Sequence, residues 1–285
     1  MFYNFLKLKD PALGIINNFK KILCPRVFKF NQNLYRMYFS CNNINNYTNI
    51  KSAISKDCLT WDIENGVRIS KLEEKKFSRI LSPSIIKIDK NLYRMYFEAR
   101  SSDKNGVIKS AISNNGYDWI EEKGTRIGNL DLISFGTPFC IKERNKSFKL
   151  FFQRRSGFKK EICFAESTDG LLFNDKKIVS LIKQENKYET YSVLGPDIIY
   201  LNNIYHMFYS GWSLKPLKGY ILYAYSHDGI NWTKRDSPVL SPGDIYDKKH
   251  CSEPSVIKIN NLWKIFYEAC DRDNTWRILC AQQSR

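Results

Sequence analysis

Several common sequence features are missing from this chain of 285 residues. Its eight cysteines form no Cys-x-x-Cys pair, which excludes the usual zinc and thioredoxin patterns. No apolar run reaches the roughly 18 residues of a membrane-spanning helix, and no secretory signal follows Met1. We therefore expect a cytoplasmic protein with free, buried thiols, because a reducing compartment keeps cysteines unpaired.

Motifs for nucleotides, nucleophiles and metals are missing as well. The sequence contains no P-loop, no Gly-x-Gly-x-x-Gly and no Gly-x-Ser-x-Gly. No spacing of histidine, cysteine and acidic residues matches a zinc site. We therefore expect no cofactor and no metal.

Acidic residues are few beside the basic ones. The chain has 45 Lys and Arg against 29 Asp and Glu, a net charge of +16. Such an excess would suit a nucleic acid or another anionic partner. The lysines are spread along the whole chain without a run of five, which is typical of a solvated surface. We expect neither a nucleic acid nor a membrane as partner.

Aromatic residues make up 14% of the chain, a composition that favours β-strands. Five segments repeat one apolar and aromatic pattern around a proline, and the prolines are spaced by 58, 55, 58 and 58 residues. The segments are CPRVFKFNQNLYRMYFS, SPSIIKIDKNLYRMYFE, TPFCIKERNKSFKLFFQ, GPDIIYLNNIYHMFYS and EPSVIKINNLWKIFYE. A repeat of this length predicts a solenoid or a propeller.

Each unit contains further strand signals. Each of these segments covers two strands, and a third apolar run follows them. In four units a turn such as Asp-Gly or Asn-Gly then leads to an aromatic residue: Trp61, Trp119, Phe173 and Trp232. Four short antiparallel strands form one propeller blade. We predict an all-β, five-bladed β-propeller that occupies residues 1–285 as a single domain, with a parallel solenoid as the competing fold.

The fifth unit ends before its fourth strand. The N-terminus supplies a candidate, because Phe5 lies six residues before Pro11, as Trp232 lies six before Pro238. We predict that Leu6–Leu13 pairs as the outer strand of the last blade, Glu253–Gln283, which closes the ring and covers two sheet edges. A disordered N-terminal extension is the alternative.

Three motifs, taken from different units, together describe the repeat: x-Pro-Ser-Val-Ile, then Tyr-x-Met-Tyr-x-Ser, then Ala-x-Ser-x-Asp-Gly-x-x-Trp. With the stretch Pro238–Glu268, they resemble the five-bladed propeller glycosidases, which include glycoside hydrolase families 43, 32, 68 and 130. The resemblance implies an active site at one end of the channel, with acids on inner strands of different blades. The chain lacks the early Asp-Pro of family 43 and the Trp-Met-Asn-Asp-Pro-Asn signature of family 32.

Two acids flank the inner-strand prolines. Because side chains alternate along a strand, the residues before and after the proline are expected on one face, so Asp197 and Glu253 should meet in the channel. We assign Glu253 as general acid and Asp197 as the second carboxylate, as glycoside cleavage requires. Glu98 and Glu268, at the ends of second strands, are the reserve carboxylates. The alternative for each is a structural hydrogen bond.

Other polar and aromatic residues are expected to bind the substrate at the channel mouth. The arginines suit phosphate or an acidic sugar, the tryptophan suits a sugar ring, and the histidine suits a hydroxyl. These residues are Arg26, Arg100, Arg155, Arg272, Trp212 and His250. The alternative for the arginines is pairing with neighbouring acids.

The sequence thus predicts a carbohydrate-active enzyme, a glycoside hydrolase or a phosphorylase or transferase with an anionic co-substrate. Its expected partner is a carbohydrate or a sugar phosphate. A non-catalytic glycan-binding or scaffold propeller is the alternative, and fold alone does not decide between them.

Overall fold

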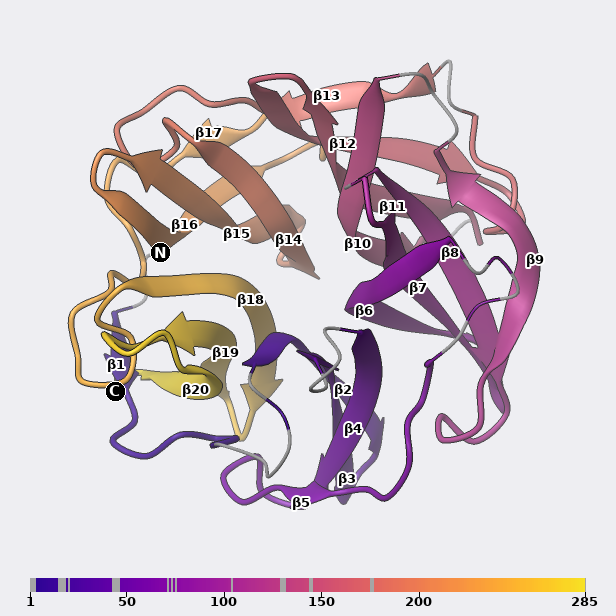
Figure 1. Cartoon of the computed structure of the whole chain (residues 1–285), viewed down its shortest axis with the longest axis horizontal. Coiled ribbons are helices and arrows are strands. Elements are labelled where there is room, and N and C mark those ends of the chain that lie inside the picture. Colours follow the sequence, from indigo (N-terminus) through magenta and orange to yellow (C-terminus); the bar gives the residue numbers. More distant parts are fainter. Residues whose placement is uncertain are drawn as a thin grey trace.

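The computed structural model describes residues 4–14, 19, 21–42, 47–70, 72, 74, 76–103, 105–128, 132–143, 146–174 and 177–284. Its strands form five antiparallel blades around a central channel, in chain order around the ring (Figure 1). The described residues contain no helix that is long and apolar enough to cross a membrane.

The blades are built alike, with the innermost strand first. Blade one contains β2 (Lys21–Asn31), β3 (Leu34–Asn42), β4 (Thr48–Ser55) and β5 (Asp62–Ile63). Blade two contains β6 (Phe77–Asp89), β7 (Leu92–Ser101), β8 (Gly106–Ser113) and β9 (Ile120–Ile127). Blade three contains β10 (Ile133–Lys142), β11 (Phe148–Ser156), β12 (Lys159–Ser167) and β13 (Val179–Ile182). Blade four contains β14 (Ser192–Leu201), β15 (Ile204–Leu214), β16 (Leu217–Ser226) and β17 (Thr233–Lys234). Blade five contains β18 (His250–Ile259), β19 (Leu262–Cys270), β20 (Trp276–Gln283) and the N-terminal β1 (Phe5–Lys7).

The N-terminal segment closes the ring. Strand β1 pairs antiparallel with β20, with Leu6 opposite Gln282 (Figure 1). Leu13 then exchanges two backbone hydrogen bonds with Ile278, at 3.1 and 3.0 Å. The predicted closure is confirmed, although the outer strand is interrupted between these two contacts.

The core lies between the blades. In three units, the aromatic residue that opens the outer part packs edge-on against a ring of the preceding blade: Trp119 on Tyr38, Phe173 on Tyr96 and Trp61 on Phe266. A turn of one blade is also hydrogen-bonded to the blade before it, because the hydroxyl of Tyr38 donates to the carbonyl of Gly116 at 2.7 Å. The repeated aromatic residues therefore join neighbouring blades, as their repetition predicts.

Every inner strand carries a β-bulge at its proline. The residue before the proline adopts a positive φ in all five blades: Cys24 51°, Ser82 50°, Thr137 47°, Gly195 60° and Glu253 48°. In blade five, Ser252 faces Glu268 and Ser255 faces Phe266, so two residues lie opposite one. A bulge of this kind redirects side chains and breaks the alternation along the strand. It decides which residues reach the channel.

Candidate active site

A cavity of about 640 Å³ occupies one end of the channel. Its walls come from the beginnings of inner strands and the ends of second strands, and all five blades contribute. Among its lining residues are the carboxylates of Glu98, Glu253 and Glu268. The cavity therefore collects three of the four predicted carboxylates.

One position at the end of each second strand joins its blade to the next. It is occupied by Ser40, Glu98, Gln153, Ser210 and Glu268, all buried. The bonds are Ser82 N to Ser40 Oγ (3.1 Å), Thr137 N to Glu98 Oε2 (3.2 Å), Gln153 Nε2 to Val193 O (2.7 Å), Glu253 N to Ser210 Oγ (2.6 Å) and Cys24 N to Glu268 Oε2 (3.0 Å). Two of these five connecting residues are acids.

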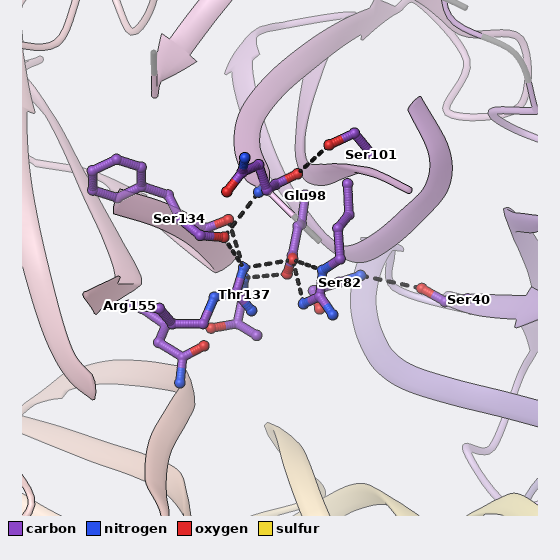
Figure 2. Close-up of polar contacts among 12 residues, drawn as sticks. Ser40, Ser82, Glu98, Ser101, Ser134, Thr137 and Arg155 are labelled. Carbon is purple, nitrogen blue, oxygen red and sulfur yellow. Dashed lines mark hydrogen bonds and ion pairs between the residues drawn. The ribbon is translucent and has the colours of Figure 1, made fainter. Parts of the chain in front are cut away.

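Glu98 is held by two arginines. Its Oε1 accepts from Arg100 Nε at 2.7 Å and from Arg155 Nη2 at 2.8 Å, and Figure 2 shows Arg155 and Thr137 directed at the carboxylate. Burial alone would raise the pKa of Glu98, but the two guanidiniums outweigh it and lower that pKa to about 2. A Cβ on Gly136 would lie 2.1 Å from Glu98 Oε2, so a glycine is required there. Glu98 is an ionised, fully bonded group.

Glu253 and Glu268 form a different kind of pair. One oxygen of each lies within 4.8 Å of the other and of Cys24 Sγ. Both oxygens of Glu268 accept hydrogen bonds, from Ser252 Oγ at 2.6 Å and from the backbone of Cys24. Among the described residues, Glu253 Oε2 accepts a side-chain hydrogen bond from Ser82 Oγ alone, at 3.3 Å. These donors stabilise a charge on Glu268, so the proton that the pair retains belongs on Glu253.

The pKa of Glu253 is raised to about 8, by burial first and then by the charges of Glu268 and Glu98. Burial also raises the pKa of Glu268 and of the Cys24 thiol. These three side chains are spaced so that they could hold a metal ion.

Cations line the cavity beside Glu98. Arg79, Arg100 and Arg155 carry three positive charges for the single charge of Glu98. Arg79 forms no ion pair within the described part of the chain, and burial and the neighbouring Arg100 lower its pKa. The predicted Arg100 and Arg155 therefore meet at one place, and Arg79 adds a cation that the sequence interpretation missed.

The signal for Arg79 was present in the repeat. The position four residues before the proline is polar in every blade: Lys21, Arg79, Ser134, Ser192 and His250. The first four of these residues line the cavity. This position contributes as much to the cavity wall as the residues that flank the proline.

Aromatic side chains form the wall on blades four and five. Trp212 and Trp276 line the cavity, and His250 lies between them with ring centroids 4.6 and 5.7 Å away. Burial and the nearby Lys249 and Lys218 lower the pKa of His250 to about 4, so its imidazole is neutral at pH 7. His250 supports the two tryptophans and is not itself a lining residue.

Asp197 and Arg26 lie outside the cavity wall. They form a buried ion pair with each other, and the backbone N–H of Val256 donates to Asp197 at 2.8 Å. The Arg26 guanidinium also stacks on Phe139 at 4.8 Å and donates to the carbonyl of Pro83. One residue from each of the five blades takes part in this cluster.

The bulge explains this placement. Strict alternation would put Asp197 beside Glu253, but the bulge turns the residue after the proline toward the neighbouring blade. Ser84 and Ser255, at the same position, accept backbone N–H groups from Cys140 and Val27 at 3.0 and 2.9 Å. Asp197 accepts the equivalent bond, so the structure does not bring it together with Glu253 in the cavity.

Arg272 also lies away from the central cavity. It borders a separate outer depression on blade five with Tyr246, Asp271 and Arg277. Its neighbour Asp271 pairs with Arg277 at 2.9 Å. The structure therefore separates Arg272 from the arginines of blades two and three.

No protein-family model matches the chain. Two curated relatives, both from Thermoanaerobacter sp. (strain X514), match part of it. A 1,2-beta-oligomannan phosphorylase is 30% identical over 97 residues, or 32% of this chain and 33% of the relative. A beta-1,2-mannobiose phosphorylase is 32% identical over 106 residues, or 33% of this chain and 35% of the relative. The matches thus span about a third of these relatives.

Solved structures match over nearly the whole chain. A glycoside hydrolase superposes with a TM-score of 0.81 at 15% identity, over 99% of this chain and 93% of the other. A structure reported for the GH130 family of mannoside phosphorylases, with glycoside hydrolases that target β-1,2 mannosidic linkages in Candida mannan, gives 0.77 at 14% identity, over 98% and 94%. This chain has the fold of glycoside hydrolases. The resemblance inferred from the blade motifs is confirmed at the level of the fold.

Proposed function

We propose that the protein is a carbohydrate-active enzyme that cleaves a mannosidic bond by inverting phosphorolysis. One observation carries the proposal: Glu253, a carboxylic acid that stays protonated at pH 7, shares a cavity with three arginines and with the ionised carboxylates of Glu98 and Glu268. The partial matches to phosphorylases of mannose oligosaccharides support the choice of substrate. The eight cysteines, all free and buried, support a reducing cytoplasm as its location.

Glu253 acts as the general acid. A pKa of about 8 keeps its proton available at neutral pH, which suits donation to the oxygen of a leaving sugar. The charge on Glu268 helps to keep that proton on Glu253. Glu268 thus acts through Glu253 and has no contact with the substrate in this mechanism.

Phosphate acts as the nucleophile. A phosphate oxygen attacks the anomeric carbon, the bond from that carbon to the glycosidic oxygen breaks, and the Glu253 proton moves to that oxygen. Arg79, Arg100 and Arg155 can neutralise the phosphate, since guanidinium groups bind it through paired hydrogen bonds. An anionic nucleophile needs no general base, so one acid is sufficient.

The carboxylate spacing favours phosphorolysis over inverting hydrolysis. An inverting hydrolase holds its two carboxyl groups about 6.5–9.5 Å apart to admit a water molecule. The nearest described partner of Glu253 is Glu268, with oxygens within 4.8 Å. That gap leaves no room for the water, and both oxygens of Glu268 already accept hydrogen bonds.

The two ends of the cavity differ in chemistry. The arginines come from blades two and three, whereas Trp212 and Trp276 come from blades four and five. A sugar ring can stack on an indole through its apolar face. We infer that phosphate enters on the arginine side and that the sugar lies against the tryptophans.

The test is turnover of β-1,2-mannobiose with and without inorganic phosphate. The expected product is mannose 1-phosphate, formed only when phosphate is present. Glu253→Gln should lower kcat by about 10²–10⁴-fold and leave the melting temperature nearly unchanged, and Arg272→Ala serves as a control that keeps full activity.

Two results would contradict the proposal. Release of free mannose at the same rate without phosphate would make the protein a hydrolase. Binding of the disaccharide without turnover in either condition would make it a glycan-binding propeller.

A further inference from the structure

Two neighbouring hairpins at the cavity mouth expose apolar side chains. Phe158, at the tip between β11 and β12, is 99% exposed, and Leu214 and Leu217, between β15 and β16, are 49% and 50% exposed. Both hairpins adjoin the cavity, because Gly157 and Trp212 line it. Leu132, another lining residue, is 93% exposed. We refer to these four exposed residues, which lie beside the mouth on blades three and four, as the apolar patch.

Lysines accompany the same hairpins. The tips read Ser-Gly-Phe-Lys-Lys and Leu-Lys-Pro-Leu-Lys, with Lys159 and Lys215 both exposed. The equivalent hairpins of the neighbouring blades differ, because they carry Asp103 in blade two and Asp271 and Asp273 in blade five. The hairpins of blades two and five therefore lack the combination of an exposed apolar tip and lysine.

We propose that these two hairpins dock the protein on an anionic lipid bilayer. Exposed apolar side chains gain free energy when they enter the boundary of the acyl chains, and lysines beside them are attracted by acidic headgroups. A second copy of the chain fits the patch poorly, since two chains of net charge +16 repel each other.

Docking of this kind needs no membrane-spanning segment. The expectation that the chain has no membrane partner rested on the lack of a long apolar run, which bears on spanning and leaves surface binding open. Because the hairpins flank the cavity, docking turns the mouth toward the headgroups. Docking does not depend on the proposed phosphorolysis and is tested without it.

The test is flotation with phosphatidylcholine vesicles that contain or lack phosphatidylglycerol. The protein should float with the anionic vesicles, and added salt should weaken the binding. Phe158→Ser with Leu217→Ser should lower the affinity at least about tenfold. Lys159→Glu with Lys215→Glu should lower it to a similar extent.

A matched control comes from the opposite end of the blades. Strand β12 (Lys159–Ser167) begins beside the cavity, which Lys160 lines, and ends at Ser167, so the turn that follows lies on the far face. Leu172 in that turn is 79% exposed, and Ile230 in the equivalent turn of blade four is 48% exposed. Leu172→Ser with Ile230→Ser should leave the binding unchanged.

Three outcomes would overturn the proposal. The first is no binding to anionic vesicles at physiological salt. The second is an equal loss of binding in the far-face control. The third is a concentration-dependent dimer in sedimentation velocity that the Phe158→Ser, Leu217→Ser variant abolishes, because the patch would then be an interface between copies.

Discussion

Glu98 and Glu268 occupy the same position in blades two and five. Each is paired with the last inner-strand residue before the bulge, Glu98 with Leu81 and Glu268 with Ser252. Each also accepts a hydrogen bond from a backbone N–H group of the next blade. Both side chains are buried. Yet the pKa of Glu98 falls to about 2, whereas burial raises that of Glu268.

The difference lies two residues further along the strands. Arg100 follows Glu98, and the next blade adds Arg155, whereas the equivalent residues around Glu268 are Cys270 and Asn42. The repeat places the two glutamates, and the position two residues further along, which carries different residues in different blades, decides the direction in which each pKa is shifted. One blade junction thus holds an ionised carboxylate, and the other helps to keep Glu253 protonated.

The largest expected effect comes from removing the arginines. Arg100→Leu with Arg155→Leu leaves Glu98 buried without its two ion-pair partners, and breaking a buried ion pair in this way costs about 3–5 kcal/mol. The free energy of unfolding in urea at pH 7 should fall by this amount. Phosphate should also raise the melting temperature less than in the wild type, because two of its three arginines are gone.

The matched control is Arg272→Leu, which removes an arginine outside the cavity. It should change the free energy of unfolding by less than about 0.5 kcal/mol. An equal loss in both variants would mean that the contrast between the two glutamates does not depend on their arginine neighbours.

The blade architecture was predictable from the sequence because the proline and aromatic positions repeat at a nearly constant period. Closure was predictable as well, since the Phe5 and Pro11 spacing repeats that of Trp232 and Pro238. The bulge was not predictable, because four of its five positive-φ positions carry residues other than glycine. The place of Asp197 depends on that bulge.

The composition of the cavity was predictable in part. Glu253 lines it, as expected from its place beside the inner-strand proline, and so do Glu268, Glu98, Arg100 and Arg155, as expected from their places at or just beyond the ends of second strands. Their charges were not predictable, because a pKa depends on neighbours from other blades. The link between Glu98 and Arg155 joins residues 57 apart in the sequence.

A second prediction concerns stability at low pH. The pKa of Glu98 is lowered in the folded protein from 4.5 to about 2, so its contribution to the free energy of unfolding is complete above pH 4.5. It is lost as the pH falls toward 2, by on the order of 3 kcal/mol. Urea unfolding at pH 6, 4 and 3 should show this loss in the wild type.

Glu98→Gln should make the free energy of unfolding less dependent on pH below pH 4.5. Glu253→Gln should leave that dependence unchanged and should alter the free energy of unfolding at higher pH instead. The pKa of Glu253 is raised from 4.5 to about 8, so the wild type loses stability as the pH rises through this range. If both variants show the wild-type slope below pH 4.5, Glu98 is not held by its arginines in solution.

The smallest expected effect is a change in the pKa of Glu253, the proposed general acid, when the charge of Glu268 is removed. Glu268→Gln keeps an oxygen that can accept from Cys24 N but removes the charge beside Glu253. Loss of a neighbouring like charge should lower the pKa of Glu253 by about one unit. Since Glu253 must be protonated to act, the alkaline limb of the kcat profile should move to lower pH by the same amount.

At pH 6 the Glu268→Gln variant and the wild type should then turn over at nearly equal rates, whereas at pH 8 the variant should be slower. Asp271→Asn is the control, because it removes a carboxylate three residues along the chain that pairs with Arg277 outside the cavity. Its profile should match the wild type. A uniform loss of kcat at every pH in Glu268→Gln would show that Glu268 acts on the substrate directly, because a residue acting only through the Glu253 pKa changes the pH dependence and leaves the acid plateau intact.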